Sequence, residues 1–174
     1  MKSTPTSLKI SSETILLIKM DIRLAENKDK TRLGELLSQV LEVHHNARPD
    51  LFKGGAKKYT DTELDAILAD EDRPIFVAES NGNVLGYAFC IFIQHKDDNI
   101  LTDVKTLYID DLCVDENVRG KGIGRALYNY VVGYAKECGC YNVTLNVWAD
   151  NKSALAFYES IGLHKQKIGM ELIL

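Results

Sequence analysis

The chain has 174 residues and a formal net charge of -4, and 45% of its residues are hydrophobic. At roughly 150 residues per domain this length predicts one domain, and the apolar fraction excludes an intrinsically disordered chain. The small acidic excess disfavours a nucleic-acid-binding protein, because such proteins usually present a basic patch. We therefore expect residues 1–14 to form a flexible lead-in and residues 15–174 to form a single domain.

The four cysteines indicate neither a metal site nor a disulfide framework. Cys138 and Cys140 are separated by one residue, whereas a zinc half-site usually has at least two residues between its cysteines. Cys90 and Cys113 lie in apolar runs, where a free thiol behaves as a small hydrophobic group. No apolar run is long enough to cross a bilayer. These features predict a cytoplasmic protein with reduced cysteines, no metal and no membrane partner.

The first third of the chain predicts one strand and two helices. Residues 18–24 alternate in hydropathy as a strand does. A helix with an apolar stripe follows, and it should end before Arg48-Pro49 because the residue before a proline avoids the helical region. Thr60 and Glu63 form a capping-box pattern that predicts a second, shorter helix. The stripe of the first helix consists of Leu33, Leu36, Leu37, Val40 and Leu41.

The remainder predicts a sheet with further helices. Asn81-Gly82 between two apolar runs is a strong hairpin signal, because both turn positions need a positive φ. The expected elements are strands at 75–79, 84–93 and 104–114, a helix at 122–138, a strand at 143–148, a helix at 151–161 and a final pair of strands ending at 174. This order, βααβββαβαββ, predicts an α/β (α+β) fold. Its twisted sheet should be mixed and mostly antiparallel, with six to seven strands and helices on both faces.

A glycine-rich segment joins the strand at 104–114 to the helix at 122–138. Free N–H groups at a helix start bind anions, and Arg119 and Arg125 add positive charge. The dinucleotide fingerprint fails, because its third glycine would fall at Arg125, and the P-loop pattern also fails. Taken alone, this segment is better explained as a glycine-rich turn with surface cations.

Two motifs together resemble the GNAT superfamily of acetyl-CoA-dependent N-acetyltransferases. The first is Arg119-x-x-Gly122-x-Gly124 after a strand, and the second is Asn151-x-x-Ala154-x-x-Phe157-Tyr158-Glu159-x-x-Gly162-Leu163. The resemblance implies that acetyl-CoA is the cosubstrate and that Tyr158 protonates the departing sulfur. It also implies that the strand backbone binds the acyl carbonyl and pantetheine arm, that the loop binds the pyrophosphate, and that Asn151 contacts the cofactor arm. The implied cofactor-binding residues are Leu112, Cys113, Val114, Arg119, Gly120, Lys121, Gly122, Ile123, Gly124, Arg125 and Asn151.

Two adjacent carboxylates, Asp110 and Asp111, interrupt the apolar strand at 104–114. Strict alternation places Asp111 with Leu107, Ile109 and Cys113 on one face, so we expect the two carboxylates to point apart. The strand resembles the acidic strand of diamine acetyltransferases, which implies that Asp110 is the base and Asp111 a secondary amine-binding or structural acid. The alternative is that both carboxylates pair with a lysine or arginine.

The acceptor is less well defined by the sequence. Lys53, Lys57 and Lys58 are most simply a solvated run, and Trp148 is expected mainly in the core, although Trp148 and Tyr59 could line an acceptor pocket. A glutamate found in ribosomal-protein alanine acetyltransferases is replaced by Asn146, which disfavours a protein N-terminus. We expect direct acetyl transfer to a small cationic primary amine. A protein or peptide amine, or a non-catalytic acyl-CoA sensor, are the alternatives, and a homodimer is possible.

Overall fold

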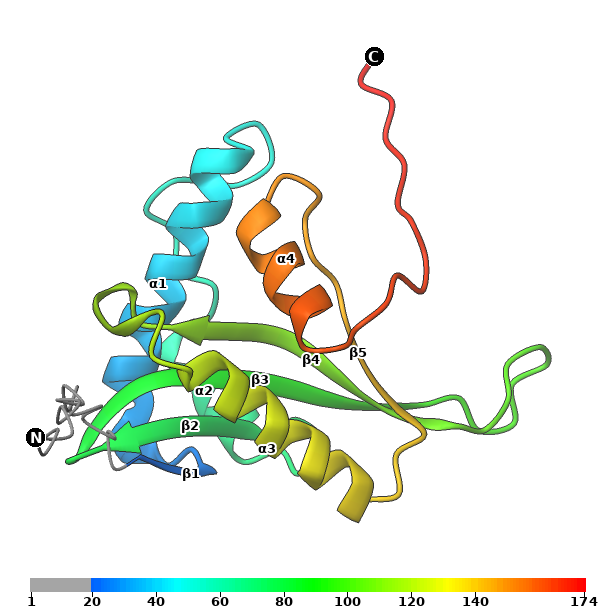
Figure 1. The fold of residues 1–174 in the computed structure, drawn as a ribbon, viewed down its shortest axis with the longest axis horizontal. Coiled ribbons are helices and arrows are strands. Elements are labelled where there is room, and N and C mark those ends of the chain that lie inside the picture. The colour runs from blue at the N-terminus through cyan, green and yellow to red at the C-terminus, as the bar shows by residue number, and fades with distance from the viewer. Residues whose placement is uncertain (1–19) are drawn as a thin grey trace, which may run out of the picture.

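In the computed structural model, residues 20–174 are described, and they form one five-stranded sheet with four α-helices (Figure 1). The strands lie in the order β1-β2-β3-β4-β5; neighbours are antiparallel except β4 and β5, which are parallel. The strands are β1 (Asp21–Leu24), β2 (Ile75–Ser80), β3 (Asn83–Gln94), β4 (Lys105–Val114) and β5 (Asn142–Leu145). The helices are α1 (Lys30–Ala47), α2 (Asp61–Leu68), α3 (Ile123–Glu137) and α4 (Lys152–Ser160), with short 3-10 turns η1 (Asn27–Asp29) and η2 (Glu116–Val118).

The local signals in the sequence are confirmed where they were strongest. Helix α1 ends at Ala47, one residue before Arg48. The Thr60 hydroxyl accepts a hydrogen bond from the Glu63 N–H at 3.2 Å, which completes the capping box of α2. Asn81 and Gly82 both have positive φ, 50° and 79°, and turn β2 into β3. The Asn81-Gly82 turn makes β2 and β3 an antiparallel pair, as the sequence predicts.

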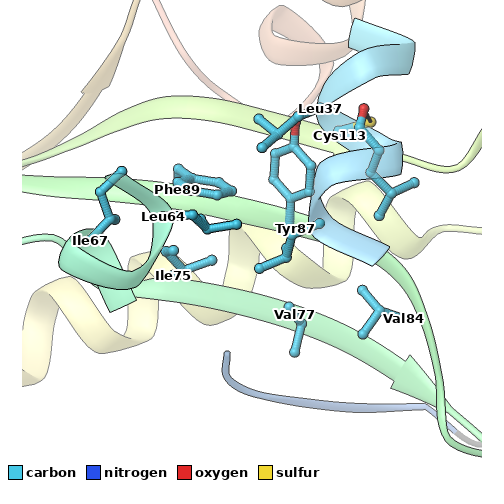
Figure 2. Packing of buried hydrophobic residues seen from close by; sticks show 11 residues of the cluster. Leu37, Leu64, Ile67, Ile75, Val77, Val84, Tyr87, Phe89 and Cys113 are labelled. Carbon is cyan, nitrogen blue, oxygen red and sulfur yellow. Dashed lines mark hydrogen bonds between the residues drawn. The ribbon is translucent and has the colours of Figure 1, made fainter. Parts of the chain in front are cut away.

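The core has two layers, one on each face of the sheet. Helices α1 and α2 cover one face, where Tyr87, Phe89 and Cys113 point toward Leu37 and its neighbours (Figure 2). Helix α3 covers the other face through Ile123 and three further buried side chains. The prediction of helices on both faces is therefore confirmed. Within residues 20–174 no helix is both long enough and apolar enough to span a membrane.

The number of strands is smaller than the six to seven expected. The final pair of strands does not form, because residues 163–174 have neither helix nor strand structure and extend away from the sheet (Figure 1). Strand β5 ends at Leu145 rather than Trp148. A strand pattern becomes a strand only when a neighbouring edge supplies hydrogen bonds, and the sequence does not contain that information. The lead-in at 1–14 and residues 18–19 of the first expected strand lie outside the described residues.

Gly86 of β3 lies so close to the backbone of β4 that a side chain at this position should destabilise the fold. A Cβ at Gly86 would lie 2.6 Å from the Cys113 carbonyl oxygen and 3.2 Å from Val114 Cα, both backbone atoms. Gly86→Ala should therefore lower the free energy of unfolding by about 2 kcal/mol or more in urea denaturation. The matched control, Gly133→Ala in α3, meets no atom within 4 Å, and it should raise that free energy by about 0.5–1 kcal/mol. A neutral Gly86→Ala variant would contradict the close approach.

Candidate active site

Strand β4 carries a β-bulge at Asp110. Phe89 of β3 lies opposite Asp111, whereas the next residue of β3, Cys90, lies opposite Ile109. Asp110 is therefore an additional residue with no partner in the register of β3. A bulge of this kind bends the strand and changes the direction of the side chains that follow it.

The bulge shifts the alternation of β4 between the two faces of the sheet. Leu107 and Ile109 pack in the cluster beneath α3, whereas Cys113 packs in the cluster beneath α1. The prediction that these residues share one face with Asp111 is wrong, because it assumed unbroken alternation. An inserted residue moves every later side chain to the opposite face.

Lys58 contacts both adjacent carboxylates. Its Nζ donates to Asp110 Oδ2 at 2.9 Å and to Asp111 Oδ2 at 3.1 Å. The prediction that the two carboxylates point apart is therefore wrong, and the alternative that both pair with a lysine or arginine is confirmed, with one lysine serving both. Lys53, Lys57 and Lys58 are all at the surface, but the Lys58 side chain is 32% exposed and its ammonium is paired with two carboxylates, so Lys58 is not simply solvated.

The charges in this cluster perturb one another. Burial raises the pKa of Asp111, whose side chain is 10% exposed, and Lys58 only partly opposes that rise. Burial alone would lower the pKa of Lys58, but the two carboxylates outweigh it and raise the pKa. Tyr59 completes the cluster by donating its hydroxyl to Asp110 Oδ2 at 3.2 Å. The cluster thus holds the ammonium group of Lys58 between two carboxylates and a phenol.

A polar clamp positions the loop after β4. The Asp115 carboxylate accepts the Asn117 N–H at 2.9 Å and forms an ion pair with Arg32 of α1. The Asn117 N–H lowers the pKa of Asp115, and Arg32 lowers it further. Arg119 folds back so that its Nε donates to the Val114 carbonyl at 3.1 Å. These contacts tie the loop to both α1 and the end of β4.

The loop ends in a helix start without a side-chain cap. Gly120 and Gly122 have φ of 77° and 80°, a conformation that other residues adopt only with strain. Gly122 is the N-cap of α3 and offers no side-chain acceptor, so the first N–H groups of the helix remain available to an anion. Three exposed cations surround this helix start, namely Arg119, Lys121 and Arg125.

Strands β4 and β5 separate beside this loop. Their pairing ends where Ile109 meets Leu145, although β4 continues to Val114. A Cβ at Gly124 would lie 3.4 Å from the Phe157 ring and 3.6 Å from Val114 Cγ2. The first turn of α3, the end of β4 and helix α4 therefore meet at one place. The predicted cofactor-binding segments, far apart in sequence, are brought together there.

Tyr158 of α4 belongs to the same region as Asp111. Burial raises the pKa of Tyr158 to about 12, and the nearby Asp111 and Cys113 add to the rise. Its hydroxyl therefore remains protonated at neutral pH. Asn151 is the N-cap of α4, and its side-chain oxygen accepts the Ala154 N–H at 3.1 Å. The structure thus gives Asn151 a capping role in the helix that carries Tyr158.

Two other predicted residues are available only through their backbone. The Cys113 thiol is buried and contacts the Leu36 carbonyl at 3.7 Å, and burial raises its pKa to about 12. Such a thiol is a poor nucleophile, because the thiolate is the reactive form. The Ile123 side chain is likewise buried in the core. Among residues 20–174, no group of three or more His, Cys, Asp or Glu side chains is placed to hold a metal ion.

The segment between α1 and α2 contributes Phe52, which the sequence did not single out, and also Lys58 and Tyr59, which it did. Trp148 is 43% exposed and meets Phe52 edge-on at 5.4 Å, so the expectation that Trp148 lies in the core is wrong. Phe52 also stacks on His44 at 5.0 Å. Lys58 and Tyr59 follow in the same segment. The only local signal was its richness in lysine and aromatic residues, which more often indicates a surface loop.

The comparisons with known proteins agree with this geometry. The model of the acetyltransferase (GNAT) family matches residues 40–163. The chain belongs to the GNAT acetyltransferase family. Members of this family use acetyl-CoA as the acetyl donor, and the matched residues contain the bulge, the glycine loop and Tyr158.

Individual relatives cover most of the chain. The uncharacterized N-acetyltransferase MJ1207 of Methanocaldococcus jannaschii is 35% identical over 145 residues, which are 82% of this chain but only 61% of that protein. The uncharacterized N-acetyltransferase YhfO of Bacillus subtilis is 31% identical over 82% of this chain and 89% of its own. A solved structure of a variant of the BH1408 protein from Bacillus halodurans superposes with a TM-score of 0.85, at 32% identity over 88% of this chain and 99% of that one.

Loss of the Lys58 ammonium should reduce stability in a pH-dependent way. In Lys58→Met, the buried Asp111 carboxylate loses its partner, so its pKa rises further above the ordinary value of 3.8. A carboxyl whose pKa is raised on folding contributes stability at low pH, and this contribution is lost as the pH rises through the folded pKa. Urea denaturation should therefore show a loss of about 1–2 kcal/mol at pH 8 and a smaller loss at pH 5.

The neighbouring Lys57 provides the control for that variant, because it is exposed. Lys57→Met should change the free energy of unfolding by less than about 0.5 kcal/mol at both pH values. An equal loss at pH 5 and pH 8 in Lys58→Met would contradict the assignment of the effect to Asp111.

Proposed function

We propose that this chain transfers the acetyl group of acetyl-CoA directly to the primary amine of a small cationic acceptor. One observation carries the choice of acceptor: Asp110 and Asp111 already hold an alkylammonium, which is that of Lys58. A primary ammonium group of a small molecule has the same charge and the same three N–H donors. An acceptor that displaces Lys58 would therefore meet a pair of carboxylates matched to it.

We assign acetyl-CoA to the place where β4 and β5 separate. The backbone of Leu112, Cys113 and Val114 lies beyond the end of the β5 pairing, on the edge that would face the pantetheine arm, and Arg119 would have to release the Val114 carbonyl for that carbonyl to take part. The backbone from Gly120 to Arg125 and the three cations around it suit an anionic pyrophosphate. When bound, acetyl-CoA supplies the thioester that the amine attacks.

Asp110 is the residue we assign to remove the acceptor's proton. An alkyl amine has a pKa of roughly 10.4, so it arrives protonated at neutral pH and must lose a proton before attack. Asp110 Oδ2 lies within hydrogen-bond distance of the ammonium held in this cluster, which is the geometry that a base requires, directly or through one water. Asp111 also accepts a hydrogen bond from this ammonium, at 3.1 Å.

Tyr158 is the acid in this proposal. Because its pKa lies near 12, it carries its proton at neutral pH and can donate it to the departing sulfur. Asn151 places Tyr158 through its cap on α4, and we assign its remaining amide group to the cofactor arm. No covalent enzyme intermediate is needed, since the Cys113 thiol is held protonated by burial.

A thiol-release assay with acetyl-CoA and a panel of amines tests this function. We expect turnover with small amines that carry at least one cationic amine, and weaker or no turnover with peptides, whose N-termini lack a matching carboxylate at Asn146. Turnover on peptides alone would overturn the choice of acceptor. Tight binding of acetyl-CoA without turnover on any amine would favour a non-catalytic sensor.

Tyr158→Phe is the informative variant in the same assay. It should lower kcat by about 100-fold or more while leaving acetyl-CoA binding intact. Because the pKa of Tyr158 is about 12, the factor should be the same at pH 7 and pH 9. Tyr134→Phe is the control. Tyr134 lies near the end of α3, away from the glycine loop, and its ring packs on Phe76 of β2 and Phe92 of β3. The kcat of this variant should be unchanged.

A further inference from the structure

Lys58 places a primary amine of the chain itself between the two adjacent carboxylates. Its Nζ donates to Asp110 Oδ2 at 2.9 Å and to Asp111 Oδ2 at 3.1 Å. The same nitrogen lies 5.4 Å from the centre of the Tyr59 ring. This is the position that the proposed function gives to the nitrogen of the acceptor. A lysine side chain ends in the same primary alkylammonium group that such an acceptor carries.

The environment of Lys58 differs from that of the other lysines that form ion pairs within residues 20–174. Lys28, Lys30 and Lys165 each meet one carboxylate, and the side chain that carries it is more than half exposed. Lys58 meets two carboxylates, and their side chains are only 26% and 10% exposed. Its amine is therefore held inside the candidate site, whereas the other three form surface ion pairs.

The acid and the donor position of the proposed function lie on the same part of β4. Asp111 directly precedes Leu112, the first of the three residues whose backbone we assign to the pantetheine arm. Tyr158 lies close enough to Asp111 for that carboxylate to add to the rise in the pKa of Tyr158. The Lys58 nitrogen, the base Asp110 and the acid Tyr158 are thus grouped around one short stretch of the strand.

We propose that the chain acetylates its own Lys58 when acetyl-CoA is bound and no acceptor has displaced the lysine. This inference rests on the proposed function, because it uses the same base, acid and donor. Asp110 takes one proton from the Lys58 ammonium, and the neutral nitrogen attacks the acetyl carbon. A C–N bond forms as the C–S bond breaks, and Tyr158 gives its proton to the sulfur. The nitrogen loses its second proton to Tyr158, and Asp110 releases the first to solvent.

The acetylated lysine is an end product and not a step in transfer to another amine. Its amide is stable and carries no charge. The modified side chain therefore no longer neutralises Asp111, which is largely buried. Self-acetylation would thus leave a permanent change in the charge of the site.

Mass spectrometry of the full chain incubated with acetyl-CoA and no added amine tests the proposal. We expect one acetyl group per chain, on Lys58, and one equivalent of released thiol. Uncatalysed acetylation should instead favour exposed Lys57, because the two carboxylates raise the pKa of Lys58 and keep its nitrogen protonated. Catalysed transfer should modify Lys58 at least about 10-fold faster than Lys57. A Lys57 that reacts as fast as Lys58 would overturn the proposal.

Two comparisons show whether the transfer is catalysed within one chain. At saturating acetyl-CoA the rate constant for Lys58 should not change when the protein is diluted. Tyr158→Phe should lower this rate constant by about 100-fold or more, and the control Tyr134→Phe should leave it unchanged. A rate constant that falls on dilution would indicate transfer between chains. That result, or an unchanged rate constant in Tyr158→Phe, would overturn the proposal.

The modified chain gives a further readout after acetyl-CoA has been removed. Its midpoint of urea denaturation should lie below that of the unmodified chain, and the difference should be larger at pH 8 than at pH 5. The reason is that the buried Asp111 carboxylate has lost its cation and is charged only at the higher pH. The same difference at both pH values would contradict acetylation of the nitrogen that pairs with Asp111.

Failure of this inference is distinguishable from failure of the proposed function. Turnover of an added amine while Lys58 stays unmodified would overturn self-acetylation and leave the proposed function standing. Acetylation of Lys58 without turnover of any added amine would support self-acetylation and overturn the small-amine acceptor. Neither reaction in a chain that binds acetyl-CoA would overturn both.

Discussion

The β-bulge at Asp110 is the constraint on which the candidate site depends. Because Asp110 is an extra residue against β3, the strand bends there, and its pairing with β5 ends one residue earlier, at Ile109. One inserted residue thus coincides with two features of the site. It lets adjacent carboxylates reach the same ammonium, and it separates the strands beside the glycine loop. Bulges are enriched next to active sites for this reason.

The small net charge of the chain hides two opposed local charges. Three exposed cations surround the uncapped start of α3, whereas Asp110 and Asp111 lie earlier on the strand that leads into that loop. Lys58 partly neutralises the acidic pair, which lets the buried Asp111 exist without an external cation. Breaking such a pair leaves a carboxylate uncompensated, so the free protein keeps its own ammonium there. Under the proposed function, an acceptor would compete with Lys58 for the two carboxylates and would not enter an empty acidic site.

Most local structure could be predicted from the sequence, whereas contacts between residues far apart in the sequence could not. The helix ends, the Thr60–Glu63 capping box and the Asn81-Gly82 turn depend on neighbouring residues, and they are confirmed. The ion pair of Lys58 joins residues 52 and 53 positions apart, so no local pattern reports it. The bulge was missed because alternation carries no mark of an inserted residue. The final strands were wrongly predicted because the alternating pattern of residues 163–174 does not specify which strand edge would pair with it.

The central claim is that Asp110 and Asp111 form an ammonium site that Lys58 occupies until an acceptor arrives. The most direct measurement is the rate at which an amine-directed reagent labels each lysine, read by mass spectrometry with and without a saturating acceptor. In the free protein we expect Lys58 to react more slowly than exposed Lys57. Acceptor binding should raise the rate at Lys58 and leave Lys57 unchanged. A bound acceptor that leaves Lys58 as slow as before would contradict the account.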